Sequence, residues 1–118
     1  MDKIVDKIAA LGVPGLVLVV AMAATGWAGA AAITTALAAL GGPIGMLGGI
    51  SVLIVLALIS KGLTTYGFEA LFKATIRKLR KQDLSNGEIM DKVKSYPISK
   101  ELKTKIMHYI DTLGDEPA

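Results

Sequence analysis

The sequence lacks cysteine, and over a long stretch it also lacks every ionisable side chain. The missing cysteine excludes disulfides, thiolate metal sites and thiol nucleophiles, although it does not by itself assign a compartment. Residues 8–60 contain no Asp, Glu, Lys, Arg or His. One bilayer-spanning helix needs about 20 mainly apolar residues, so this stretch is long enough for two crossings. Pumps and proton-coupled transporters place ionisable groups inside the membrane, so the missing charge argues against a selective ion carrier.

The uncharged stretch is divided near residues 41–45, where glycines and Pro43 favour a reversal of the chain. The first half, from Pro14 to Leu40, would span roughly 40 Å as one helix and is expected to tilt or to kink near Gly26. The second half, from Pro43 to Ser60, would span about one hydrocarbon thickness. We therefore predict an all-α fold built on a membrane helical hairpin of two transmembrane helices.

A second interpretation of the hairpin is a buried helix pair in a soluble core, since helices that are apolar on all sides occur there too. The chain has 118 residues, a hydrophobic share of 53% and a mean hydropathy of +0.55, which leaves few residues to cover such a pair. These values favour the membrane. Lys3 and Lys7 precede the apolar run as in a signal peptide, but the run continues far past Ala30, which favours a retained anchor.

The sequence divides into three regions. Residues 1–12 form a short amphipathic segment, with Ile4, Val5, Ile8 and Leu11 on one helical face. Such a segment could lie at the membrane interface. Residues 13–62 form the transmembrane hairpin, with its turn near residues 41–45. Residues 63–118 are expected to form a membrane-proximal helical subdomain with an acidic tail.

The third region carries clear helix signals. Residues 64–82 show an apolar stripe at helical spacing, formed by Phe68, Leu71, Phe72, Thr75, Ile76 and Leu79. Ser85 and Glu88 have the spacing of a capping box, which predicts a short helix that ends by Tyr96, because Pro97 follows. A last helix is expected to begin after Ser99 and to close at Gly114. The sequence therefore predicts a basic amphipathic helix followed by two short C-terminal helices.

Small residues recur every four positions in the hairpin, in three series: Ala21, Thr25 and Gly29; Ala28, Ala32 and Ala36; and Gly41, Gly45 and Gly49. In lipid, close backbone approach through small residues is a principal source of helix association, although glycine and alanine are also common in membrane helices generally. We expect close helix packing here, and we favour contacts between chains over contacts within one chain, so that a homo-oligomer results. The predicted contact residues are Ala21, Thr25, Gly29, Ala32, Ala36, Gly45, Gly48 and Gly49.

A cluster of basic residues follows the hairpin. Cationic side chains beside an anionic bilayer each gain roughly 1 kcal/mol, so the cluster predicts binding to lipid headgroups, with anionic lipid as the partner. A calmodulin-like protein or nucleic acid could also bind such a face, but the adjacent bilayer is the nearer anion, and we expect no nucleic acid. The cluster also predicts an integral membrane protein with both termini cytoplasmic, because positive charge flanks the side that stays inside. Its members are Lys61, Lys73, Arg77, Lys78, Arg80 and Lys81.

The sequence gives little support to enzyme chemistry. His108 is the sole histidine, and its position near Met107 and Tyr109 favours a surface or packing role over that of a general base. The glycines of the hairpin do not match a phosphate loop, because no Lys-Ser or Lys-Thr pair follows them. We therefore expect no catalytic residue, no cofactor and no metal site.

The uncharged turn, the two apolar helices and the charged tail resemble the layout of two-helix holins, which are small phage membrane proteins. The Gly/Ala-rich helices are also similar to those of small helical bacteriocins. The resemblance covers the hairpin and the charge layout, and no residue is assigned from it.

Three functional hypotheses follow. The first is a self-associating integral membrane protein that permeabilises or remodels a bilayer, as an oligomeric pore former or a holin-like effector. The second is a nonconducting membrane anchor or scaffold whose C-terminal helices, within residues 82–113, recruit a soluble protein partner. The third is a soluble helical bundle that hides the apolar hairpin until it is triggered.

Overall fold

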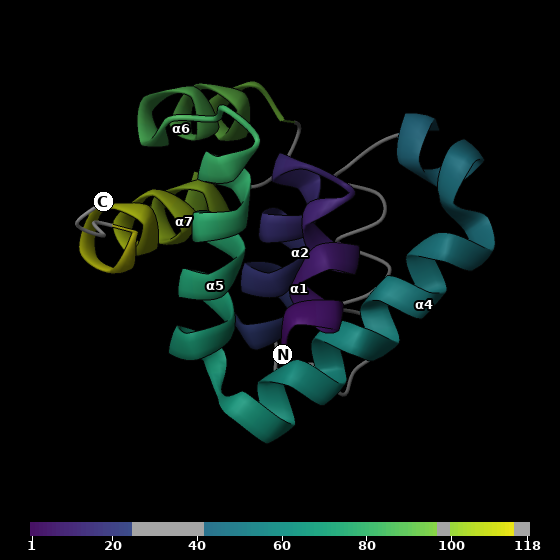
Figure 1. Ribbon diagram of the computed structural model, residues 1–118. Coiled ribbons are helices and arrows are strands. Elements are labelled where there is room, and N and C mark those ends of the chain that lie inside the picture. The colour runs from purple at the N-terminus through teal and green to yellow at the C-terminus, as the bar shows by residue number, and fades with distance from the viewer. Residues whose placement is uncertain (25–41, 97–99, 115–118) are drawn as a thin grey trace.

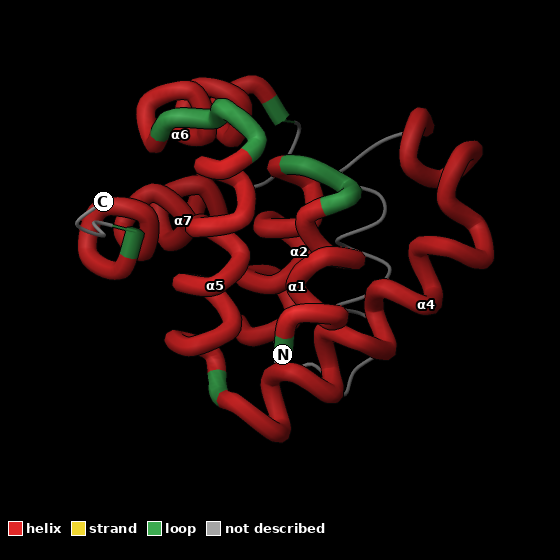
Figure 2. Tube along the Cα trace, in the orientation of Figure 1, coloured by secondary structure: helices red, strands yellow, loops and turns green. Residues whose placement is uncertain are grey.

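The computed structural model describes residues 1–24, 42–96 and 100–114, and at residues 42–53 it describes the backbone only. The described residues form six helices and no strand, so the predicted all-α class is confirmed for them (Figures 1 and 2). The helices are α1 (Asp2–Ala9), α2 (Val13–Ala24), α4 (Gly42–Tyr66), α5 (Phe68–Lys81), α6 (Asn86–Ser95) and α7 (Lys100–Leu113).

Helix α2 is the central helix of the described part of the chain. It contacts α1, α4, α5, α6 and α7. Figure 1 shows it behind α1 and between α5 and α4. Its side chains at Leu16, Val17, Leu18 and Val19 are fully buried. A helix that is apolar on all sides has no face to direct toward water, so a central position suits its sequence.

The turn between α1 and α2 folds the two helices onto each other. The two helix axes are bent by 115° at this break. Gly12 has a φ of +76°, which is a conformation that favours glycine, and its amide donates to the carbonyl of Ala9. The predicted apolar face of the N-terminal segment is buried in the structure, with Ile8 fully covered, and α1 lies against α4 and α5.

The border between α4 and α5 differs from the prediction. The sequence predicts that the second hairpin helix ends at Ser60 and that the amphipathic helix begins at Thr64, whereas α4 continues to Tyr66. Lys61 does not end α4, because a charged side chain at the surface of a helix leaves its backbone hydrogen bonds intact. The border is instead Gly67, whose φ of 88° and ψ of 163° stop one helix and let α5 leave in another direction.

The C-terminal helices confirm the local sequence signals. The Ser85 hydroxyl accepts a hydrogen bond from the Glu88 amide, and the Glu88 side chain returns to the Ser85 amide, so the capping box is present. Helix α7 ends immediately before Gly114 as predicted. Its Ile106 and Ile110 are fully buried, and the Tyr109 ring lies 4.7 Å from that of Phe68 and 5.9 Å from that of Phe72 between centroids.

Buried side chains from all the described helices form one hydrophobic cluster, which is the core of this part of the molecule. Among residues with described side chains, no single helix has both the length and the apolarity to cross a membrane. Helices α1 and α2 meet that test only together, as a bent pair, and Ile54–Tyr66 is apolar but shorter. The predicted transmembrane hairpin thus has weak support from the structure.

Candidate membrane-binding surface

Helix α5 has one apolar face and one basic face. Its buried face carries Leu71, Phe72, Ile76 and Leu79, all of them fully covered. Thr75 is also buried, and its hydroxyl satisfies its hydrogen bonding by donating to the carbonyl of Leu71 at 2.8 Å. The opposite face is therefore the part of α5 that is left for water or for a partner.

The outward face of α5 carries three cations. Lys73, Arg77 and Lys81 recur every four residues, so they lie along one side of the helix, with Ala70 and Ala74 beside them. Arg77 and Lys81 are exposed, and Lys73 is half-buried. We call these three residues the basic stripe.

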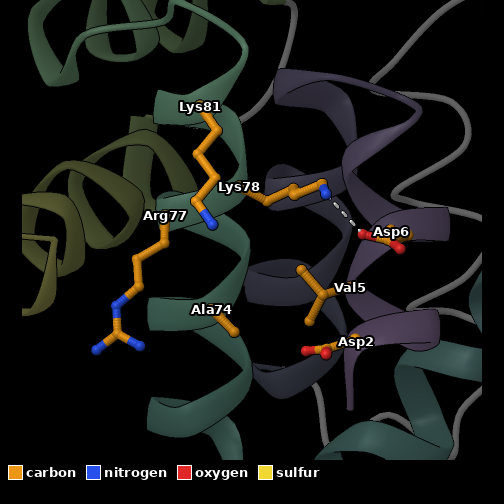
Figure 3. A pocket seen from close by; sticks show the side chains of 7 residues that line it. All are labelled: Asp2, Val5, Asp6, Ala74, Arg77, Lys78 and Lys81. Atoms are coloured by element: carbon orange, nitrogen blue, oxygen red, sulfur yellow. Dashed lines mark ion pairs between the residues drawn. The ribbon is translucent and has the colours of Figure 1, made fainter.

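A shallow depression of about 330 Å³ lies where α1 meets α5 (Figure 3). Val5 of α1 and Ala74 of α5 face each other across it, and Lys78 reaches from α5 toward Asp6, with its ammonium nitrogen 2.9 Å from a carboxylate oxygen. Both members of this ion pair are largely exposed, so it contributes little to stability. Asp2, Arg77 and Lys81 also line the depression.

A second depression of about 430 Å³ adjoins the first and shares Ala74 and Arg77 with it. It is lined in addition by Met1, Glu69, Ala70 and Lys73. The Met1 amino group donates to the Tyr66 hydroxyl at 3.1 Å, which links the start of α1 to the end of α4. The basic stripe therefore lines the two adjoining depressions, which are also lined by the carboxylates of Asp2, Asp6 and Glu69.

Arg80 has a different role from its neighbours. Its Nε donates to the Asn86 side chain at 3.1 Å, and its Nη2 donates to the carbonyl of Gly114. The Asn86 amide also donates to that carbonyl, at 3.2 Å. These bonds join the end of α5, the start of α6 and the end of α7. Arg80 therefore stabilises the packing of three helices.

The end of α5 is closed by its own backbone. Asp83 has a φ of 67°, and the Leu84 amide donates to the Leu79 carbonyl while the Asp83 amide donates to the Arg80 carbonyl. This is a Schellman motif in which aspartate takes the position that glycine usually occupies. Lys78, Arg80 and Lys81 lie in the last turn, where their charge interacts favourably with the helix dipole.

The six cations predicted to bind headgroups are thus divided among several positions. Lys61 is exposed on α4, and the basic stripe is on α5. Lys78 contacts α1 through Asp6, and Arg80 contacts Asn86 and Gly114.

The predicted small-residue contacts fall mostly where side chains are not described. Ala21 belongs to α2 and is buried, with 4% of its surface exposed. The backbone of Gly45, Gly48 and Gly49 belongs to α4. The remaining positions, Thr25, Gly29, Ala32 and Ala36, lie outside the described residues.

His108 is exposed on α7, with its ring 5.8 Å from that of Tyr109 between centroids. Burial raises the pKa of the Tyr96 hydroxyl, which disfavours a phenolate. Within the described residues, no three His, Asp or Glu side chains are grouped to hold a metal ion.

The sequence analysis missed the long-range polar contacts of α5. The pairing of Asp6 with Lys78 and of Arg80 with Gly114 joins residues that are far apart in the chain. The packing of α4 against α5 did have a local signal in the sequence, at Gly62, because a glycine among bulky residues indicates that another helix packs closely there. A Cβ there would lie 3.1 Å from the Leu71 side chain.

Comparison of the chain with protein families, with curated proteins and with solved structures finds no match.

Proposed function

We propose that this chain is a self-associating, membrane-active protein that inserts its uncharged segment into a bilayer and permeabilises or remodels it. The observation that supports this best is the contrast between α2 and the helices around it. Helix α2 has no charged residue and is enclosed by α1, α5, α6 and α7, which carry charged residues. The same helix would be equally well solvated by lipid, because lipid tails are as apolar as a leucine-rich core.

The two ends of the apolar segment have backbone features that suit a rearrangement. Gly12 separates α1 from α2, and Gly67 separates α4 from α5, and both have positive φ. Changes in a few backbone angles at such positions are how segments swing about a hinge. In the proposed mechanism, the uncharged part of the chain between these glycines, up to Ser60, leaves the amphipathic helices and enters the bilayer.

Leaving the core has a free-energy cost. Leu71, Ile76 and Ile106 would lose a buried environment, at roughly 25 cal/mol for each Å² of apolar surface exposed to water. Contact with lipid or with another copy of the chain must offset this cost. The proposal therefore predicts that insertion needs a membrane and that association accompanies it.

Insertion can be tested with the single tryptophan of the sequence, Trp27, which lies in the uncharged segment. The purified protein is mixed with vesicles that contain brominated lipids, and Trp27 fluorescence is followed together with the release of a trapped dye. We expect quenching of Trp27 and dye release at the same protein concentrations. Quenching without release would favour the nonconducting anchor, and the absence of both would contradict the proposal.

Self-association can be tested at Gly49, which lies in α4. Gly49→Leu adds bulk at a predicted helix contact and should split the assembly without preventing insertion, because leucine suits both helix and lipid. Gly49→Ala is the matched control, since it keeps the position small. Assembly mass and dye release are measured on the same preparations. Full dye release from a monomeric Gly49→Leu protein would exclude an oligomeric pore.

A further inference from the structure

We infer that the basic stripe of α5, formed by Lys73, Arg77 and Lys81, is the surface on which the protein docks on anionic lipid headgroups before its apolar segment inserts. The inference rests on the proposed membrane activity and identifies the site and the class of lipid that begin it. Three features of α5 support it in turn: the face that the helix leaves available, the cations that belong to this face, and the partner that its charge pattern fits.

The first step concerns how α5 can contact a membrane. An amphipathic helix usually lies in the interface with its apolar face in the acyl region. Here that face is already occupied, because Leu71, Phe72 and Ile76 are fully buried in the protein core. Helix α5 therefore meets a bilayer through its charged side, and docking is electrostatic rather than insertional. Such contact weakens as salt increases.

The second step concerns which cations take part. Lys78 reaches toward α1, where the Asp6 carboxylate lies 2.9 Å from its ammonium nitrogen, and Arg80 reaches toward α6 and α7, where it donates to Asn86 and Gly114. Arg77 and Lys81 are exposed and Lys73 is half-buried, and Figure 3 shows Arg77 directed away from α1. The alanines beside the stripe are short, so the longer cationic side chains can reach a flat surface first. The stripe is thus the part of the cluster that is best placed to touch headgroups.

The third step concerns the partner. Asp2 and Asp6 line the first depression beside the stripe, and Glu69 lines the second. A nucleic acid carries its phosphates at fixed, close spacing and would bring some of them against these carboxylates. No aromatic side chain lines either depression to stack with bases. Lipid headgroups diffuse within the bilayer and can gather at the cations alone.

The test compares the unmodified protein with a triple variant, Lys73→Gln, Arg77→Gln and Lys81→Gln. Binding is measured by flotation with phosphatidylcholine vesicles, with and without phosphatidylglycerol. Three cations near an anionic surface contribute about a hundredfold to the affinity for the membrane. We therefore expect the triple variant to bind anionic vesicles in low salt about a hundredfold more weakly than the unmodified protein. The unmodified protein should bind vesicles of pure phosphatidylcholine weakly. Added glycerol phosphate should compete poorly, because one free phosphate engages few of the cations.

The matched control removes the same charge elsewhere, with Lys92→Gln, Lys94→Gln and Lys105→Gln on the exposed surfaces of α6 and α7. This control should keep most of the binding. Equal loss in both triple variants would show that net charge alone matters and would overturn the inference, as would full binding by the stripe variant. Thermal unfolding of each variant verifies that the fold is intact.

Dye release on the same samples separates this inference from the proposed function. Salt-sensitive binding that depends on the stripe, but releases no dye, would leave the docking surface supported and the permeabilising function contradicted. Dye release that is equal in the stripe variant and the unmodified protein would support the function and overturn the docking surface. Strong glycerol phosphate competition would identify a site for free phosphate and would overturn the assignment to lipid.

Discussion

At the scale of single residues, neighbouring cations of α5 have different physical roles. Arg80 and Lys81 are adjacent in the sequence, yet Arg80 donates to Asn86 and Gly114 whereas Lys81 is exposed. A planar guanidinium can donate to two acceptors at once in fixed directions. A lysine ammonium has rotatable donors on a flexible side chain and holds two acceptors in a less fixed geometry. The effect of a substitution here therefore depends on the contacts of each residue more than on its charge.

The contacts of Arg80 give the first prediction. Arg80→Met removes the hydrogen bonds to Asn86, at the start of α6, and to Gly114, just after α7, and hydrogen bonds from a charged group contribute about 1.5–3 kcal/mol. Because Asn86 still donates to Gly114, we expect a loss of about 1–2 kcal/mol in the free energy of unfolding. Urea denaturation measures it, with the exposed Lys81→Met as control. Equal stability of both variants would contradict the structural role of Arg80.

The second prediction concerns the closest approach of α1 to α2. A Cβ at Gly15 would lie 2.1 Å from the Ile8 carbonyl oxygen, so Gly15→Ala forces two backbones apart. Overpacking of this kind costs about 1–3 kcal/mol. Gly87→Ala is the control, because a Cβ there meets only the Ser85 hydroxyl at 3.9 Å. Thermal unfolding should separate the two variants, and a neutral Gly15→Ala would show that α1 and α2 pack less closely.

At the scale of elements, the junction of α4 and α5 depends on one residue. A Cβ at Gly67 would meet nothing within 4 Å, so space does not explain the glycine. The backbone conformation of Gly67 explains it, because a residue with a side chain rarely adopts a φ of 88° with a ψ of 163°. The junction is thus held by backbone conformation rather than by packing.

The third prediction uses this distinction. Gly67→Ala should lower the free energy of unfolding by about 1–3 kcal/mol, although it creates no collision. Gly67→Asn should be equally unfavourable, since asparagine is tolerated in the left-handed helical region but not at this ψ. Denaturant unfolding of both variants is the measurement, with Gly87→Ala as reference. Rescue by asparagine would place the junction in the left-handed helical region instead.

At the scale of the whole molecule, α2 and the C-terminal helices belong to one core. Ile106 of α7 and Leu18 of α2 are both fully buried in the same cluster. The amphipathic helices and the apolar helix therefore stabilise each other, and loosening one is expected to release the other.

The fourth prediction follows from this coupling. Ile106→Asp buries an unpaired charge and should loosen α7 by several kcal/mol. Because α7 contacts α2, we expect this variant to release dye from anionic vesicles at lower protein concentrations than the unmodified protein. Thr104→Asp places the same charge on the exposed side of α7 and should change neither property. Limited proteolysis reports the loosening. A loosened Ile106→Asp protein with unchanged dye release would show that the core does not restrain insertion.

Elements whose signals are local could be predicted from the amino-acid sequence. The apolar stripe of α5, the capping box at Ser85 and the end of α7 before Gly114 depend on residues a few positions apart, and the structure has all three. The length of α4 differs from the prediction: the uncharged stretch ends at Ser60, before Lys61, whereas α4 continues to Tyr66, where Gly67 ends the helix.

The surroundings of α2 and the different contacts of the α5 cations depend on how the helices pack, and they could not be predicted from local patterns. A helix that is apolar on all sides is stable in lipid and in a protein core alike, so its sequence cannot distinguish the two environments. The partners of Lys78 and Arg80 are the distant residues Asp6 and Gly114, which no local pattern brings together. Local patterns determine helices because backbone hydrogen bonds link near neighbours, whereas burial and ion pairing depend on which helices meet.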